Sequence, residues 1–91
     1  MADDEVRVWL VERTYGDDEL NLVILTYATL DGERYFRKER ALTSFTGPSR
    51  ETTAALEVDP GDLGRTPSDD REYYASAARR TASGHDPDDA V

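Results

Sequence analysis

The chain of 91 residues contains no cysteine, which excludes disulfide bonds and thiolate metal ligands. Its longest wholly aliphatic run, from Leu22 to Leu25, is far shorter than the roughly 20 apolar residues that a membrane-spanning helix needs. Residues 1–5, Met-Ala-Asp-Asp-Glu, are acidic and lack an apolar stretch, so we expect no signal peptide. These absences predict a cytoplasmic protein that makes no contact with a membrane.

Lysine is also scarce, because Lys38 is the one lysine among 11 basic residues, whereas 20 residues are acidic. The resulting net charge of -9 should repel nucleic acid and anionic membranes through the overall field of the protein. Such a composition is typical of cytoplasmic proteins of halophiles, since molar salt shortens the Debye length to about 3 Å and screens the repulsion between acids. The alternative is an ordinary acidic bacterial protein from a GC-rich genome.

Large apolar side chains are few and unevenly distributed. Leu, Ile, Val and Phe total 17, and 13 of these lie within residues 5–45. The first half of the chain can therefore form a core, and the second half must pack against it. Because a chain of this length fits one domain, we predict a disordered N-terminus over 1–4, a single domain over 5–84 and a flexible acidic tail over 85–91.

Three segments of the first half have the patterns of β-strands. Residues 5–13 alternate between apolar and polar side chains, residues 19–30 are apolar on both faces, and residues 34–43 carry scattered cations. Turn residues separate them at Gly16-Asp17-Asp18 and at Asp31-Gly32. The sequence therefore predicts an antiparallel meander with the second strand in the centre.

The loop at Asp31-Gly32 decides which side chains share a face of this sheet. A three-residue loop with a bulge predicts one core face, and a two-residue loop would turn the third strand over. We favour the bulged loop because it places Phe36 in the core. The predicted face consists of Val6, Val8, Leu10, Leu20, Leu22, Ile24, Phe36 and Leu42.

The second half combines a loop at 44–51, a short segment at 52–58 and a helix. Residues 52–58 fit either a fourth strand or one helical turn, and the strand is favoured. The helix is predicted from Thr66 as N-cap, with Pro67 at its first position, to Ser83, with Gly84 as C-terminal cap. The face predicted to lie on the sheet consists of Tyr73, Tyr74, Ala77, Ala78 and Thr81.

The predicted fold is therefore α+β, with a three- to four-stranded antiparallel sheet and one C-terminal helix packed on one face. One helix cannot cover both faces of a sheet. The face predicted to lie opposite the helix consists of Trp9, Val11, Val23, Leu25 and Tyr27. Either residues 44–66 cover this candidate interface or a second subunit does, because exposed apolar patches usually mark interfaces. We predict a homodimer with Trp9 near its centre.

The third predicted strand carries the one basic segment of the chain. Its candidate residues for contact with an anion or nucleic acid are Arg34, Tyr35, Arg37, Lys38 and Arg40. Aromatic rings interleaved with cations are typical of surfaces that bind single-stranded nucleic acid. The alternative is an edge strand whose charges prevent pairing with other sheets.

Candidate catalytic residues are sparse. His85, the one histidine, follows the predicted helix without oriented partners, and the acid pairs at 17–18, 69–70 and 88–89 fit a solvated surface. The loop over 44–50 could hold an anion on its backbone N–H groups, but it lacks a Gly-Lys-Ser/Thr phosphate motif. We therefore predict no enzyme, no cofactor and no metal site.

The sequence resembles a group of small uncharacterised haloarchaeal proteins. The resemblance rests on Asp31-Gly32-Glu33-Arg34-Tyr35-Phe36-Arg37-Lys38-Glu39-Arg40, on Val58-Asp59-Pro60 followed by Leu63, and on a helix rich in Tyr and Ala that precedes His85-Asp86-Pro87-Asp88-Asp89. It implies a halophilic habitat, and it implies no activity.

These observations predict a non-catalytic protein-interaction module of a halophilic cytoplasm, which associates with itself through the sheet face or binds an unknown protein partner. The alternative is a nucleic-acid-associated or regulatory protein that uses the Arg-rich third strand.

Overall fold

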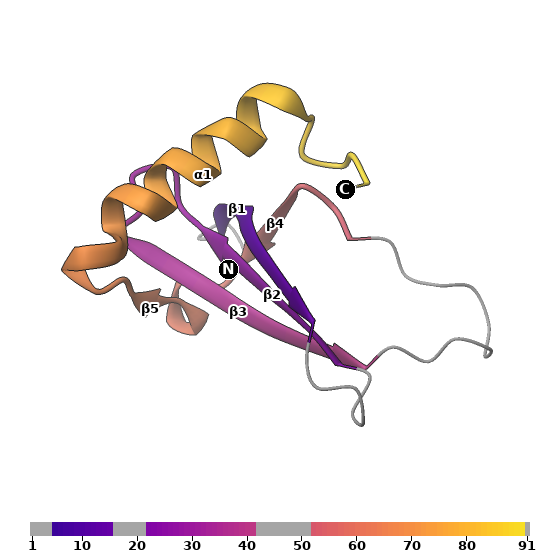
Figure 1. Cartoon of the computed structure of the whole chain (residues 1–91), viewed down its shortest axis with the longest axis horizontal. Coiled ribbons are helices and arrows are strands. Elements are labelled where there is room, and N and C mark those ends of the chain that lie inside the picture. Colours follow the sequence, from indigo (N-terminus) through magenta and orange to yellow (C-terminus); the bar gives the residue numbers. More distant parts are fainter. Residues whose placement is uncertain (1–4, 16–21, 42–51, 91) are drawn as a thin grey trace.

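The computed structural model describes residues 5–15, 22–41 and 52–90 (Figure 1). The predicted N-terminal segment at 1–4, the turn at 16–18 and the loop at 44–51 lie outside the described residues. So do Leu20 and Leu42 of the predicted core face.

The described chain forms a five-stranded antiparallel sheet with one α-helix. The strands are β1 (Val6–Tyr15), β2 (Leu22–Ala28), β3 (Arg34–Ala41), β4 (Ala55–Val58) and β5 (Gly64–Arg65), in the order β4-β1-β2-β3-β5. The helical elements are the 3-10 turns η2 (Pro60–Asp62) and η3 (Ser68–Asp70) and the helix α1 (Arg71–Gly84). The predicted α+β fold is confirmed, residues 52–58 contain a strand, and β5 is a strand that the pattern analysis missed.

The sheet is curled, because its two edge strands follow each other in the chain. In a flat sheet, β4 and β5 would be separated by four inter-strand spacings, about 19 Å in total. Residues 59–63 join them and contain the compact turn η2, so their reach is about 16 Å. The edges therefore approach each other around a core formed by Val6, Val8, Leu10, Val23, Leu25, Tyr27, Phe36, Leu56, Val58 and Leu63.

The predicted register of β2 is wrong. Tyr27 pairs with Leu10 on one side and with Phe36 on the other, so the odd-numbered residues of β2 face this core in place of Ile24. The bulge lies in β1, between Leu10 and Glu12, while the pairing of β2 with β3 is regular. Because β2 is apolar on both faces, its alternation could not specify which face is buried.

Helix α1 packs across the other face of the sheet, mainly against β1 (Figure 1). A second cluster of Trp9, Ala54, Ala55 and Ala78, extended by Val11 and Ala82, fills this layer. Small alanine side chains allow the helix to lie close to the sheet, and the indole of Trp9 occupies the space between them. The Thr81 hydroxyl also donates a hydrogen bond of 2.7 Å to the carbonyl oxygen of Leu10.

The helix begins later than predicted. Its N-cap is Asp70, whereas Thr66 is 1% exposed and uses its N–H to bond the carbonyl oxygen of Glu33 at 3.0 Å. The chain at Thr66 thus continues the sheet beside β3 instead of capping a helix. Gly84 is the last helical residue and His85 follows as C-cap. Tyr73 is 52% exposed, so it lies outside the buried helix face, which includes Ala75 instead.

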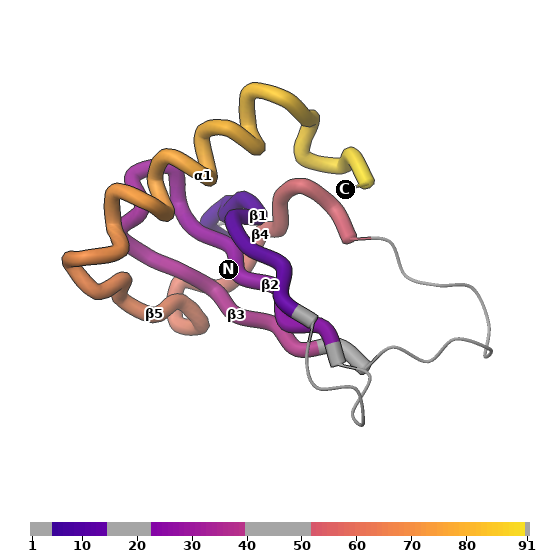
Figure 2. Tube along the Cα trace, in the orientation of Figure 1, coloured from indigo at the N-terminus to yellow at the C-terminus, as the bar shows by residue number. Residues whose placement is uncertain are grey.

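The sequence predicts a flexible acidic tail over 85–91, and residues 85–90 form backbone hydrogen bonds with the segment at the start of β4. The N–H of Ala54 donates to the carbonyl oxygen of Asp89 at 2.8 Å, and the N–H of Ala55 donates to that of Pro87 at 3.1 Å. The segment therefore lies beside the start of β4 (Figure 2). Backbone hydrogen bonds hold it there in the absence of large apolar side chains.

Replacing Gly32 by alanine should destabilise the domain by about 2 kcal/mol or more. Gly32 has φ 73, and an added Cβ would lie 2.2 Å from the carbonyl oxygen of Arg71 and 2.7 Å from the amide nitrogen of Ala75. Urea unfolding followed by circular dichroism measures the loss. Gly84→Ala is the control, since its Cβ would meet no atom within 4 Å. Equal stability of the two variants would show that the turn at Gly32 is not in close contact with the backbone of α1.

Deleting residues 86–91 should cost about 1–3 kcal/mol, because it leaves the N–H groups of Ala54 and Ala55 without acceptors at buried positions. The same unfolding measurement checks this loss. Asp88→Asn keeps both backbone bonds and should change stability by less than about 0.5 kcal/mol. A truncated chain as stable as the full chain would show that the segment contributes nothing to the fold.

Candidate functional site

The five residues of the predicted interface lie on both sides of the sheet. Trp9 and Val11 belong to the layer beneath α1, whereas Val23, Leu25 and Tyr27 belong to the core of the curled sheet. The expectation that they form one face opposite the helix is wrong, because the register of β2 differs from the predicted one. Trp9 is 7% exposed and Leu25 is 0% exposed. The chain therefore covers these side chains itself.

The basic residues of β3 alternate between the two faces of the sheet. Tyr35 and Arg37 point to the side of α1, and Arg34 and Lys38 share the opposite face with Phe36. Arg40 pairs with Val23 in the backbone register, and its side chain lies outside the described ones. The predicted group is thus divided into two surfaces.

On the face away from α1, Arg34 gains a cationic neighbour from β5. Arg34 and Arg65 are direct partners in the β3–β5 pairing, and both side chains are exposed. Residues paired in this way have Cβ atoms about 5 Å apart. Neither guanidinium forms an ion pair or a side-chain hydrogen bond with another described residue. Sequence reasoning missed Arg65, because the two-residue strand β5 has no alternating pattern to reveal it.

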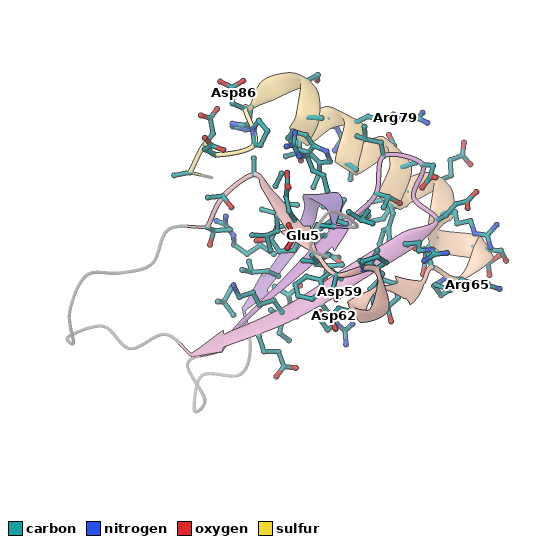
Figure 3. The ribbon with its side chains drawn as sticks, turned by 180° about the vertical axis from the view of Figure 1, so that it is seen from behind. Glu5, Asp59, Asp62, Arg65, Arg79 and Asp86 are labelled. Atoms are coloured by element: carbon teal, nitrogen blue, oxygen red, sulfur yellow. The ribbon has the colours of Figure 1, made fainter. Side chains whose placement is uncertain are left out.

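The cationic patch is defined as Arg34, Lys38 and Arg65. Figure 3 shows Arg65 at the end of the sheet where α1 begins, and Arg79 farther along the helix. Lys38, on the same strand face as Arg34, is half-buried. The patch therefore brings positive charge from two strands to one face.

On the side of α1, tyrosine rings form a row from the sheet to the helix. The ring centroids of Tyr35 and Tyr74 are 6.4 Å apart, and those of Tyr73 and Tyr74 are 5.8 Å apart. Tyr35 lies over Gly64, where an added Cβ would be 2.7 Å from its ring. Burial raises the pKa of the Tyr74 phenol, and the nearby carboxylates raise it further. The row packs α1 onto β3 and leaves the ring of Tyr73 at the surface.

The turn before β3 is held by Asp31. Its carboxylate accepts hydrogen bonds from the Thr29 hydroxyl at 2.6 Å and from the Glu33 N–H at 3.0 Å. These hydrogen bonds hold the pKa of the Asp31 carboxyl below its ordinary value, and the bond from the Thr29 hydroxyl has the largest effect. The carboxylate therefore fixes the turn that presents Arg34 at the start of β3.

Two shallow hollows flank the C-terminal segment. One, of about 340 Å³, lies between β4 and Pro87, beside the ion pair in which Arg7 Nε donates to Glu57 at 2.8 Å. The other, of about 230 Å³, borders His85, whose Nδ1 is 3.9 Å from a carboxylate oxygen of Asp89. Neither hollow is lined by a residue of the predicted interface or of the predicted anion-binding set.

The remaining sequence candidates stay dispersed in the described part of the chain. Asp69 and Asp70 are exposed in η3, and Asp88 and Asp89 are exposed beside β4, while residues 17–18 lie outside the description. Within the described ranges, no three His, Asp or Glu side chains are grouped to hold a metal ion. No helix among these residues has the length and apolarity to cross a membrane.

Comparison with known proteins gives a family but no activity. A family model described as "Family of unknown function (DUF7967)" matches residues 2–91. The chain belongs to this family. No curated protein and no solved structure matches the chain. Membership of DUF7967 thus agrees with the prediction of an uncharacterised family and leaves habitat and activity to be argued from the residues.

Trp9→Ala should destabilise the domain by about 3–5 kcal/mol, since it empties the space between the sheet and α1. If Trp9 is an ordinary internal residue, the urea midpoint of the unmodified chain should be the same at about 10 µM and about 200 µM protein, because association would couple stability to concentration. Val11→Ala, at the half-buried margin of the same layer, should cost less. Two results together would support a homodimer centred on Trp9. The urea midpoint would rise with protein concentration, and Trp9→Ala would have only a small effect on stability at the lower concentration.

Proposed function

We propose that this DUF7967 member is a non-catalytic binding protein that holds a single-stranded nucleic acid on the cationic patch of Arg34, Lys38 and Arg65. The observation that carries the proposal is the direct pairing of Arg34 with Arg65 without an ion-pair partner among the described residues. Arg34 and Lys38 come from the Arg-rich strand that the sequence singles out, and Arg65 adds a charge from a second strand.

Like charges directly opposite each other destabilise a strand pair. The chain has 20 acidic residues that could relieve this repulsion, yet neither arginine has a carboxylate from the described residues as its ion-pair partner. A bound phosphate group would relieve it, because guanidinium groups match phosphate oxygens in charge and geometry. The Asp31 carboxylate interacts electrostatically with Arg34 without forming an ion pair, and a bound phosphate would add a second anion between the two guanidinium groups.

The arrangement of the patch favours an extended ligand. Arg34 and Lys38 are four residues apart on one strand face, which corresponds to about 13 Å. The partly buried ring of Phe36 lies between them on this face. Cations spaced along a strand suit a single strand whose phosphates contact them, while the ring of Phe36 packs against the core of the curled sheet. The net charge of -9 opposes any long polyanion, so we expect weak binding to a short segment.

Fluorescence anisotropy with a labelled oligothymidylate of about 12 nucleotides tests this function. Three phosphate contacts predict that log K falls with log of the KCl concentration with a slope of about -2. The double variant Arg34→Gln/Arg65→Gln should weaken binding and reduce the slope to about -0.7. Arg79→Gln/Arg80→Gln removes the same charge from exposed helix positions and should leave the slope unchanged.

Two results would refute the proposal. One is the absence of binding at low salt, and the other is an equal loss in both double variants, which would show that only net charge matters. Equal binding of a labelled poly-glutamate peptide would assign the patch to acidic proteins instead of nucleic acid.

Protein interaction, including self-association, is the second candidate. The sheet face first considered for it is covered within the chain. Its support now comes from the exposed ring of Tyr73 and from the outer edge of β3, which beyond Tyr35 pairs with no strand of the described residues. Tyrosine and arginine are the side chains most enriched in protein interfaces. A halophilic cytoplasm remains part of the proposal, supported by the net charge of -9 and the single lysine.

A further inference from the structure

Arg34 and Arg65 form the closer of the two kinds of pair that alternate along antiparallel strands. The Thr66 N–H donates to the carbonyl oxygen of Glu33, whereas the carbonyl oxygen of Arg34 accepts from the Thr29 N–H on the side of β2. The backbone groups of Arg34 therefore point away from Arg65. Opposite residues of this non-hydrogen-bonded kind have Cα atoms about 4.5 Å apart, and their side chains approach each other most closely.

The cationic patch is uneven along its length. Arg34 is the first residue of β3 and Arg65 is the last residue of β5, at the end of the sheet where α1 begins (Figure 3). Lys38 lies four residues farther along β3 on the same face, about 13 Å away. Two guanidinium groups thus stand at one end of the patch, and a single ammonium group stands farther along it.

A single-stranded nucleic acid offers two kinds of phosphate to these cations. An internal phosphodiester carries one negative charge. A terminal phosphate monoester carries a charge of about -1.5 to -2 near pH 7, and it has three oxygens that accept strong hydrogen bonds. Two adjacent guanidinium groups match the terminal group, because each presents a planar fork of N–H donors to phosphate oxygens. One ammonium group matches the single charge of an internal phosphate.

We propose that the Arg34–Arg65 pair holds the terminal phosphate of a single-stranded nucleic acid, while Lys38 contacts an internal phosphate of the same strand. This inference rests on the proposed function and specifies which part of the ligand each cation binds. The ligand class is therefore a phosphorylated strand end, rather than any segment within a strand.

The nearby carboxylate of Asp31 leaves both guanidinium groups available to such a ligand. Its Oδ1 accepts the hydrogen bonds from the Thr29 hydroxyl and the Glu33 N–H, which hold it within the turn. It forms no ion pair with Arg34, and Arg65 likewise has no ion-pair partner among the described residues. Both arginine side chains are also exposed, so a phosphate can reach them from solvent.

Fluorescence anisotropy with oligothymidylates of about 12 nucleotides tests this inference. The strands carry a dye at the 3′ end, and their 5′ end is a hydroxyl, a phosphate or the methyl ester of that phosphate. We expect the 5′-phosphate to raise the affinity at least about fivefold over the hydroxyl in about 0.1 M KCl. The methyl ester keeps only one negative charge, so its gain should stay below about twofold. A second set, with the dye at the 5′ end and the phosphate at the 3′ end, shows whether the pair holds that end instead.

Variants of the patch assign the preference to the arginine pair. Arg34→Gln and Arg65→Gln should each abolish the preference for the phosphorylated strand, and Arg65→Lys should reduce it, because an ammonium group lacks the planar fork. Lys38→Gln is the matched control. It should weaken the binding of phosphorylated and hydroxyl-ended strands by the same factor and keep the preference. Circular dichroism checks that each variant is folded.

The outcomes separate this inference from the function on which it rests. Equal affinity for phosphorylated and hydroxyl-ended strands in both sets would overturn the inference and leave the proposed function in place. A preference that survives both glutamine variants, or an equal gain from the methyl ester, would also overturn it, because the pair would then not recognise a doubly charged end. The absence of binding to every strand at low salt would refute the proposed function itself.

Discussion

The five-residue connection between β4 and β5 is the constraint on which the rest of this structure depends. These strands form opposite edges of the sheet, yet the chain between them cannot span a flat sheet. The resulting curl encloses Val8, Leu25 and Tyr27 without help from the helix. It lets a short chain, with few large apolar residues, bury both faces of β2.

The opposite face of the sheet, beneath α1, is covered by a layer of mostly small side chains. The alanines of α1 and of the segment before β4 surround Trp9 there, and the Thr81 hydroxyl bonds to the backbone at the β1 bulge. The indole supplies most of the apolar volume that the alanines lack. The two layers therefore differ in composition. Aliphatic residues together with Tyr27 and Phe36 fill the curled sheet, whereas Trp9, alanines and the Tyr35–Tyr74 ring pair fill the interface with the helix.

The secondary-structure elements were predicted correctly where the sequence pattern was clear. The meander, the strand at Ala55–Val58 and the C-terminal helix are present, because alternation, turn residues and helical spacing are local signals. The register of β2 could not be predicted, since Ile24 and Leu25 are equally suited to a core and only the tertiary curl chooses between them.

The candidate site shows the same limit. Arg34 and Lys38 could be selected from the sequence because they belong to a basic segment. Arg65 could not, because its importance comes from a pairing with Arg34 that exists only after the sheet has curled. Likewise, the backbone bonds that hold residues 85–90 leave no mark in a sequence without apolar anchors.

Under the proposed function, the position of Arg65 would link anion binding to the stability of the whole domain. Arg65 is the second residue after the connection between the two sheet edges, and its repulsion with Arg34 opposes the pairing of β5 with β3. An anion that bridges the two guanidinium groups binds the curled chain and has no equivalent site in the unfolded chain. By mass action such a ligand would stabilise the folded state, because binding to the folded chain alone shifts the population toward it.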